Sequence, residues 1–349
     1  MVMTMALGCG GDDERQPSLV DAPTAIDVPF PVDGGPPDAP PCVSALTFAV
    51  IGTGHNLPRD VVVDDHDVYW SDWFTDLSRG GGRIYVAPKD GSAAAVVRSA
   101  VADVPDFDIG GLTLHAGALY WVDHRYVPTL GRAVDTIRTM PVAGGTPTDL
   151  ATGQVIHFVV GDDGVYFASI DPVSGGGVIA HVPLGGGPVT TVGTSADQFT
   201  SLAADATTLF GATVADGIWR MDKRGGDPII IAAGARGDVL VHGPDVYWLE
   251  APTFAVRRVP KVGGPVTTLL DGGAAAFTRA TFDGEALLLA TDRTIGRLPL
   301  TGGPLEPLLC PADGADLDIG AIAVDATHVY VTYAQGQDAS GVRRSPRAP

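Results

Sequence analysis

The chain has 349 residues, of which 41 are acidic and 22 basic, and its net charge is −19 at pH 7. This balance argues against nucleic acid as a partner, because phosphates favour basic surfaces. No stretch approaches the run of about 18 apolar residues typical of a membrane-spanning helix.

Residues 1–9 end in Ala6-Leu7-Gly8-Cys9. These residues resemble a bacterial lipobox, which implies an exported protein whose Cys9 is lipid-modified, at the periplasm or outer membrane. The run before Cys9 is short for a signal peptide, and a start codon placed too far downstream would explain this. The alternative is an ordinary Met-rich start with a chance cysteine.

Residues 10–44 hold eight prolines and many aspartates, with no apolar periodicity. Such a composition cannot bury enough apolar surface to fold alone. We therefore expect a disordered, extended tether ahead of a folded domain that spans residues 45–349.

The folded domain repeats one motif seven times, at a period of roughly 40 residues. Its first half is clearest at Asp64 to Trp70 and its second half at Val256 to Gly264. An aromatic or apolar residue marks the register in each copy: Tyr69, Tyr120, Tyr166, Phe210, Tyr247, Leu288 and Tyr330. Five positions earlier the copies carry Asp64, His115, Gly161, Asp205, His242, Asp283 and Asp325.

Each repeat predicts four short strands, here called a to d, rich in Val, Ile, Thr and aromatic residues. Asp or His at the a–b turn can bond to nearby backbone and stabilise a tight reversal. Gly-Gly at the c–d turn supplies the positive φ that such hairpins need. Four-stranded units at this period predict an all-β fold, a seven-bladed β-propeller, with six blades as the alternative.

The count of strands predicts how the ring closes. The seventh repeat ends before it has room for strand d, while the run from Leu46 to Ile51 precedes the first repeat without a partner. We expect this N-terminal strand to complete blade seven, which would remove the exposed edges of an open array.

Two sequence motifs resemble those of known propellers. Tyr69-Trp70-Ser71-Asp72 and Tyr120-Trp121-Val122-Asp123 are similar to the motif of YWTD-type propellers. The Val-Tyr-Trp and Arg-Val-Pro-Lys-x-Gly-Gly pattern resembles exported bacterial TolB-like propellers. The resemblance covers residues 45–346 and implies a propeller fold, which hosts many unrelated functions.

Loops of unequal length predict a binding surface. The b–c connections at 71–83, 122–136, 168–177 and 332–341 are long and belong to blades 1, 2, 3 and 7, which are neighbours in the ring. Function tends to lie on such loops. The contact residues that we expect there are Trp73, Phe74, Arg79, His124, Arg125, Tyr126 and Tyr333.

Two d–a loops carry the same acidic spacing. Asp103-x-x-Asp106-x-Asp108 precedes blade 2, and Asp313-x-x-Asp316-x-Asp318 precedes blade 7. Carboxylate oxygens crowded at the channel mouth could hold Ca²⁺. Asp106, Asp108, Asp316 and Asp318 are the candidate ligands, and solvated acidic loops are the alternative.

Cys42 and Cys310 are the remaining cysteines of the chain. In an exported protein they could form a disulfide. The alternative is two independent small apolar residues.

The sequence favours a non-enzymatic, monomeric binding scaffold at the cell envelope, with no cofactor other than possible Ca²⁺. Its partner would be an envelope or extracellular protein, a peptide or a glycan, and a lipid anchor would be its only link to the membrane. No nucleophile elbow, paired metal-binding histidines or phosphate loop is present. The alternative function is a metal-assisted hydrolase or lyase that uses Asp108, Asp318 and His124.

Overall fold

The computed structural model describes residues 46–53, 57–72, 82–93, 95–100, 107–127, 129, 132–272, 276–277, 279–310, 318–334 and 340–347. They belong to one compact unit, Cys42–Pro349. Over these residues the structure contains strands and turns and no helix, so no helix there is long and apolar enough to cross a membrane.

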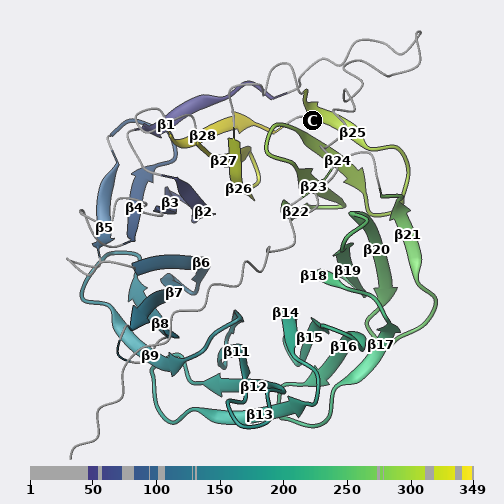
Figure 1. Cartoon of the computed structure of the whole chain (residues 1–349). Helices are drawn as coiled ribbons and strands as arrows, with labels where there is room; N and C mark the ends of the chain where they lie inside the picture. The colour runs from purple at the N-terminus through teal and green to yellow at the C-terminus, as the bar shows by residue number, and fades with distance from the viewer. Residues whose placement is uncertain are drawn as a thin grey trace, which may run out of the picture. The chain divides into compact units, whose positions relative to one another are not determined.

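Seven four-stranded antiparallel sheets form the blades of the propeller (Figure 1). The innermost strands a are β2 (Pro58–Val63), β6 (Phe107–His115), β10 (His157–Gly161), β14 (Phe199–Ala204), β18 (Gly237–His242), β22 (Arg279–Asp283) and β26 (Asp318–Val324). The strands b are β3 (Asp67–Asp72), β7 (Ala118–Val127), β11 (Gly164–Ile170), β15 (Thr208–Thr213), β19 (Asp245–Glu250), β23 (Ala286–Ala290) and β27 (His328–Ala334).

The outer half of each blade completes the sheet. The strands c are β4 (Arg83–Pro88), β8 (Arg132–Pro141), β12 (Gly177–Val182), β16 (Gly217–Asp222), β20 (Ala255–Pro260), β24 (Ile295–Pro299) and β28 (Gly341–Pro346). The strands d of blades 1 to 6 are β5 (Val96–Ala100), β9 (Thr148–Gly153), β13 (Thr190–Ser195), β17 (Ile229–Ala233), β21 (Thr267–Leu270) and β25 (Glu306–Leu309). The predicted seven blades are confirmed.

The N-terminal strand closes the ring, as the strand count predicts. β1 (Ala49–Thr53) pairs antiparallel with β28, from Ala49 opposite Arg344 to Thr53 opposite Gly341. Blade 7 is thus assembled from both ends of the folded domain, in the order β1-β28-β27-β26 (Figure 1).

The repeated turn residues act as their chemistry predicts. The Asp64 carboxylate accepts backbone N–H bonds from His66 and Asp67 at 2.8 and 2.7 Å, and Asp205 and Asp325 cap their own a–b turns in the same way. At the c–d turn, Gly263 and Gly264 have φ values of 90° and 144°. A residue with a Cβ atom rarely adopts such angles, so the Gly-Gly pair is a property of the scaffold.

The apolar core lies between blades and not within them. Among the described residues there is one cluster of buried side chains at each of the seven junctions. The cluster at the closing junction packs Val68 and Trp70 of blade 1 against Tyr330 and Val342 of blade 7. A single blade therefore has no core of its own, which explains why the repeats must stack.

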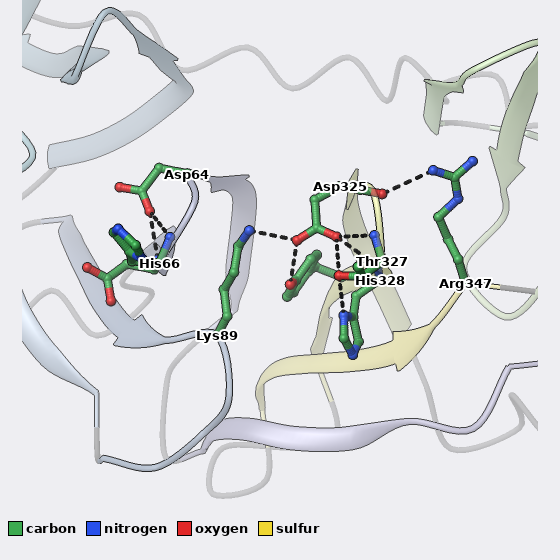
Figure 2. A network of polar contacts seen from close by, with 9 residues as sticks. Asp64, His66, Lys89, Asp325, Thr327, His328 and Arg347 are labelled. Atoms are coloured by element: carbon green, nitrogen blue, oxygen red, sulfur yellow. Dashed lines mark hydrogen bonds and ion pairs between the residues drawn. The ribbon is translucent and has the colours of Figure 1, made fainter.

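A repeated ion pair links adjacent blades at four junctions. These pairs lie on the side of the propeller that carries the a–b and c–d turns, which we call the clasp side. The residue after strand c in one blade reaches the a–b turn of the blade before it. The pairs are Lys89 with Asp325 at 2.6 Å, Lys223 with Asp163 at 3.3 Å, Lys261 with Asp205 at 2.8 Å, and Arg347 with Asp283. Figure 2 shows Lys89 reaching Asp325 across the closing junction.

All three lysines of the chain occupy this one position. Each ammonium also lies over an aromatic ring of the preceding blade: Lys89 over Tyr330, Lys223 over Tyr166 and Lys261 over Phe210. Where the a–b register holds His115 or His242 in place of Asp, the next blade carries Leu184 or Leu300 in place of the cation. At these junctions the a–b residue and the residue after the next strand c change together, whereas at the junction of blades 1 and 2 Asp64 corresponds to Val142 and not to a cation.

Candidate binding site between blades 1, 2 and 3

The opposite side, which carries the b–c and d–a connections, is here called the ligand side. The prediction of a long loop at 122–136 is wrong, because most of this segment belongs to two paired strands. β7 and β8 continue as paired strands from Ala118 opposite Pro141 to Val127 opposite Arg132. The segments on both sides of the turn lack Gly and Pro, which would interrupt pairing, so the insertion forms an extended hairpin. Arg125 is exposed on it.

His124 and Asp135 face each other across this hairpin. They are direct cross-strand partners, and His124 Nδ1 lies 3.0 Å from Asp135 Oδ1. Asp135 is buried, and its Oδ2 accepts the backbone N–H of Val155 at 2.7 Å. The contact with Asp135 fixes the orientation of the imidazole, with Nδ1 toward the carboxylate and Nε2 on the other side of the imidazole.

The neighbouring carboxylate, Asp123, lies on the opposite face of β7. It accepts the indole N–H of Trp121 at 2.8 Å and forms an ion pair with Arg138 at 2.6 Å. Burial raises the pKa of Asp123 to about 6, outweighing the attraction of Arg138 and the Trp121 bond. Asp123 and His124 therefore do not act as a pair, as the alternation of a strand requires.

A pocket of about 340 Å³ opens where blades 1, 2 and 3 meet. Blade 1 contributes Arg59, blade 2 contributes Gly110 to Thr113 with Val122 and His124, and blade 3 contributes Val155 to Phe158. The pairing of β6 with β7 is irregular between Gly110 and Thr113. A Cβ atom at Gly110 would lie 3.3 Å from His124 Nε2, so the missing side chain leaves space beside this nitrogen.

Two further titratable groups belong to the inner strands here: His157 lines the pocket, and Asp60 follows the lining residue Arg59 without lining the pocket itself. Asp60 accepts hydrogen bonds from the Ser71 hydroxyl at 3.0 Å and the Leu112 N–H at 3.3 Å, and burial raises its pKa despite them. His157 keeps exposed surface, but protein surrounds it on the inner strand β10. This desolvation lowers its pKa, against the attraction of Asp238, and favours the neutral imidazole.

The predicted contact residues differ in where the structure places them. His124 lines the pocket and Arg125 is exposed beside it. Tyr333 is 1% exposed within the core between blades 6 and 7, with the Arg343 guanidinium 4.1 Å from its ring centre, so it presents no contact surface. Tyr126 lies in β7, but its side chain is not described, and Trp73, Phe74 and Arg79 lie outside the described residues.

The predicted metal and cysteine residues fall largely outside the described part. Asp318 begins β26 and is exposed; Asp108 lies in β6 with its side chain not described; Asp106 and Asp316 lie outside. Within the described residues no group of three or more His, Cys, Asp or Glu could hold a metal ion.

Cys310 is buried and disulfide-bonded. Cys42 and Cys9 lie outside the described residues, so the pairing of Cys42 with Cys310 stays a prediction.

Sequence reasoning missed four residues of this site: Arg59, Asp60, Asp135 and His157. Asp135 could have been found by treating 122–136 as a hairpin, because His124 and Asp135 then fall opposite each other. Arg59, Asp60 and His157 begin inner strands of different blades, and only the ring geometry brings them to one opening.

No protein-family model and no curated protein matches the chain. Solved structures do. The structure of YCF48 bound to D1 peptide is 9% identical, covers 88% of this chain and 96% of its own, and has a TM-score of 0.60. The AfRom2 CNH domain is 11% identical, with coverage of 87% and 100% and a TM-score of 0.57.

A computationally designed protein, Ika8, is 12% identical, with coverage of 85% and 99% and a TM-score of 0.54. Likenesses at this low identity concern the fold alone. The chain is a β-propeller repeat protein.

Proposed function

We propose that this protein is a non-enzymatic binding scaffold whose ligand side, at blades 7, 1, 2 and 3, holds a segment of a partner protein, a peptide or a glycan. The observation that carries the proposal is the pocket between blades 1, 2 and 3, lined by a fixed imidazole. Rigid strands position His124, and the exposed hairpin β7–β8 stands beside it. Preformed concave sites with a few placed polar groups are typical of binding sites.

The fold is compatible with this function. The solved propeller YCF48, of similar fold, carries a bound peptide. In the present chain the clasp side repeats the same kind of ion pair at four junctions, whereas the ligand side differs between copies. Specific recognition needs such a difference, because identical blades would present seven equivalent sites.

Site-specific photo-crosslinking tests the proposal. A photoreactive amino acid in place of Arg125 should trap a partner from the native envelope, because Arg125 is exposed beside the pocket. The same amino acid in place of Arg224, which is exposed on the c–d turn of blade 4, is the matched control on the clasp side. Equal yields of the same adducts from both positions would contradict the proposal.

The location at the cell envelope is part of the proposal and rests on Cys9 and the Pro- and Asp-rich residues 10–44. Metabolic labelling with a radioactive fatty acid should mark the wild-type protein. Cys9→Ser should remove the label, and persistence of the label in that variant would exclude Cys9 as the lipidated residue.

A further inference from the structure

The outermost strands of the seven blades form the rim of the propeller (Figure 1). In the described part of each sheet, this strand has a neighbouring strand on one side only. An exposed strand edge can pair with a strand of another chain, and natural proteins prevent this with charged residues, proline, irregular pairing or short strands. Six of the seven outer strands contain a charged residue, a proline, a glycine or a hydroxyl side chain.

The outer strand of blade 4, β17, lacks all of these features. Its sequence is Ile-Ile-Ile-Ala-Ala, with no charge, hydroxyl, proline or glycine. Ile229 and Ile230 are 52% and 40% exposed, whereas Thr190 and Thr191 occupy the equivalent positions in blade 3. Uncharged runs of β-branched residues without proline are those that most readily pair as strands.

The backbone of β17 is open on its outer side as well. Beyond the pairing with β16, no backbone hydrogen bond joins Ile229–Ala233 to another described segment. Two other outer strands give backbone carbonyls to neighbouring segments: Val192 of β13 accepts the Gly226 N–H, and Leu308 of β25 accepts the Leu46 N–H at 3.0 Å. β17 therefore presents both apolar side chains and unpaired backbone groups to solvent.

The charges that flank β17 favour a second copy of this chain as its partner. Asp227 precedes the strand and Arg236 follows it; both are exposed, and neither forms an ion pair within the described part of the chain. In an antiparallel pair of two β17 strands, the start of each strand lies beside the end of the other. With Ile231 at the centre, Asp227 of each copy lies one register position from Arg236 of the other, which gives two equivalent contacts between opposite charges.

The same register places large residues opposite small ones. Ile229 faces Ala233 of the second copy, and Ile230 faces Ala232, so the isoleucine side chains have room at the contact. Both copies use the same strand about a two-fold axis, so the pairing ends at two chains and does not continue into a fibre.

We infer that β17 is a self-association edge, at which two copies of this protein pair as antiparallel strands through blade 4. The inference goes beyond the proposed function, because it concerns the rim and not the ligand side. It also differs from the monomeric state expected from the sequence. A contact between strands of five residues is small for a specific interface, so we expect a dissociation constant of about 10 to 100 µM.

Exchange of charge between two variants tests this inference. Asp227→Arg and Arg236→Asp each place like charges at both contacts, so each variant alone should associate at least about tenfold more weakly than wild type. In an equimolar mixture the two variants meet with opposite charges at both contacts, and mixed dimers should form with nearly the wild-type affinity. Sedimentation velocity of the full chain, from about 1 to about 500 µM, measures the association.

A lysine in the edge tests the strand itself. Ile230→Lys should prevent association over the whole concentration range, because a charge at an exposed edge opposes pairing. Thr191→Lys is the matched control in β13, since Thr191 is exposed at the equivalent position and should leave association unchanged. Thermal melting verifies that each variant is folded.

Dimers that Asp227→Arg, Arg236→Asp and Ile230→Lys weaken, and that the mixture restores, support the inference. A wild-type chain that stays monomeric at every concentration overturns it. So does a dimer that these substitutions leave unchanged, that Thr191→Lys weakens equally, or that the mixture fails to restore. The trapping of a partner at Arg125 tests the ligand side separately, so either result can fail without the other.

Discussion

The clasp side and the ligand side of the propeller are built from the same seven repeats, but they use them differently. On the clasp side, Asp205 and Asp325 occupy the same register and meet the same kind of partner, Lys261 and Lys89. On the ligand side, the equivalent inner-strand positions carry Asp60 in blade 1 and His157 in blade 3. Residues that repeat between blades therefore stabilise the ring, and residues that differ between blades are those that can give specificity for a ligand. Four predictions test this division, beginning with the largest effect.

Removing the aspartate of the closing clasp should cost the most stability. Asp325 accepts hydrogen bonds from Lys89, from Tyr330 OH and from the backbone of Thr327 and His328. Asp325→Ala leaves these partly buried donors unpaired, so we expect the free energy of unfolding in urea at pH 7 to fall by about 3 kcal/mol.

The control for this variant is Asp162→Ala, because the Asp162 side chain is fully exposed (101%) although it lies near His115. Equal losses in the two variants would show that the clasp contributes nothing beyond an ordinary surface charge. Burial alone would raise the pKa of Asp325, but Lys89 and the N–H donors hold it well below its usual range. Its contribution is therefore present at neutral pH and is lost only in strong acid, as pH falls through that lowered pKa.

Asp123 on the ligand side should show the opposite pH dependence. Its folded-state pKa of about 6 lies above the ordinary 3.8, so the folded protein binds a proton that the unfolded chain has already released between these values. Stability from this group is present at low pH and is lost as pH rises through about 6. The free energy of unfolding of Asp123→Asn relative to wild type should thus increase by about 2 kcal/mol from pH 4.5 to pH 7.5.

Urea denaturation of both proteins across this pH range measures the difference. Taking the difference cancels the other titrating groups. A flat difference between the two proteins would mean that Asp123 stays ionised throughout.

The matched residues of the clasp should be exchangeable between junctions. His242→Asp alone adds a carboxylate without a cation, and Leu300→Lys alone adds a cation without a carboxylate. Because these positions correspond to Asp205 and Lys261 one junction earlier, the double variant should be about 1 kcal/mol more stable than the two single effects predict.

The reverse exchange, Asp205→His with Lys261→Leu, is the matched cycle at the neighbouring junction. Strict additivity in both cycles would refute a pairwise exchange. Positive coupling at one junction and none at the other would limit the rule to that junction.

The smallest effect belongs to the ligand side. Arg125 is exposed on the hairpin, so Arg125→Ala should change the free energy of unfolding by less than about 0.5 kcal/mol. Lys261→Ala, which removes an ion pair and a contact with the Phe210 ring, is the comparison on the clasp side and should cost more. A larger loss from Arg125→Ala would mean that the hairpin supports the fold and is not reserved for a ligand.

Much of the architecture follows from the sequence because it depends on local, repeated chemistry. Asp64 caps its turn through its own backbone neighbours, and Gly263-Gly264 needs only its own φ angles. The ion pair between Lys89 and Asp325 could not be predicted from local sequence, because 236 positions separate the two residues. The repeat marks both residues as regular, but only closure of the ring places the last blade beside the first.

The candidate site was predicted less well for the same reason. His124 and Arg125 were found from their residue types on a long insertion, yet Tyr333 was expected at the surface and is buried. β27 continues through Tyr333 to Ala334 and is buried continuously from Val329 to Tyr333, so Tyr333 belongs to the core strand and not to a surface loop. Arg59 and His157 carry no local signal at all, because a pocket between blades is a property of three separate segments.

Closure of blade 7 by β1 also has a consequence for the order of events in folding. The hydrogen bonds of β1 require Gly341 to Arg344, which lie almost 300 positions later in the chain (Figure 1). During synthesis, Ala49 to Thr53 must therefore remain without their strand partner while six complete blades are made. Contacts so distant in sequence form slowly, and an unpaired strand edge invites pairing with other chains. We therefore expect the tendency to aggregate to be greatest in the interval before the last blade is complete.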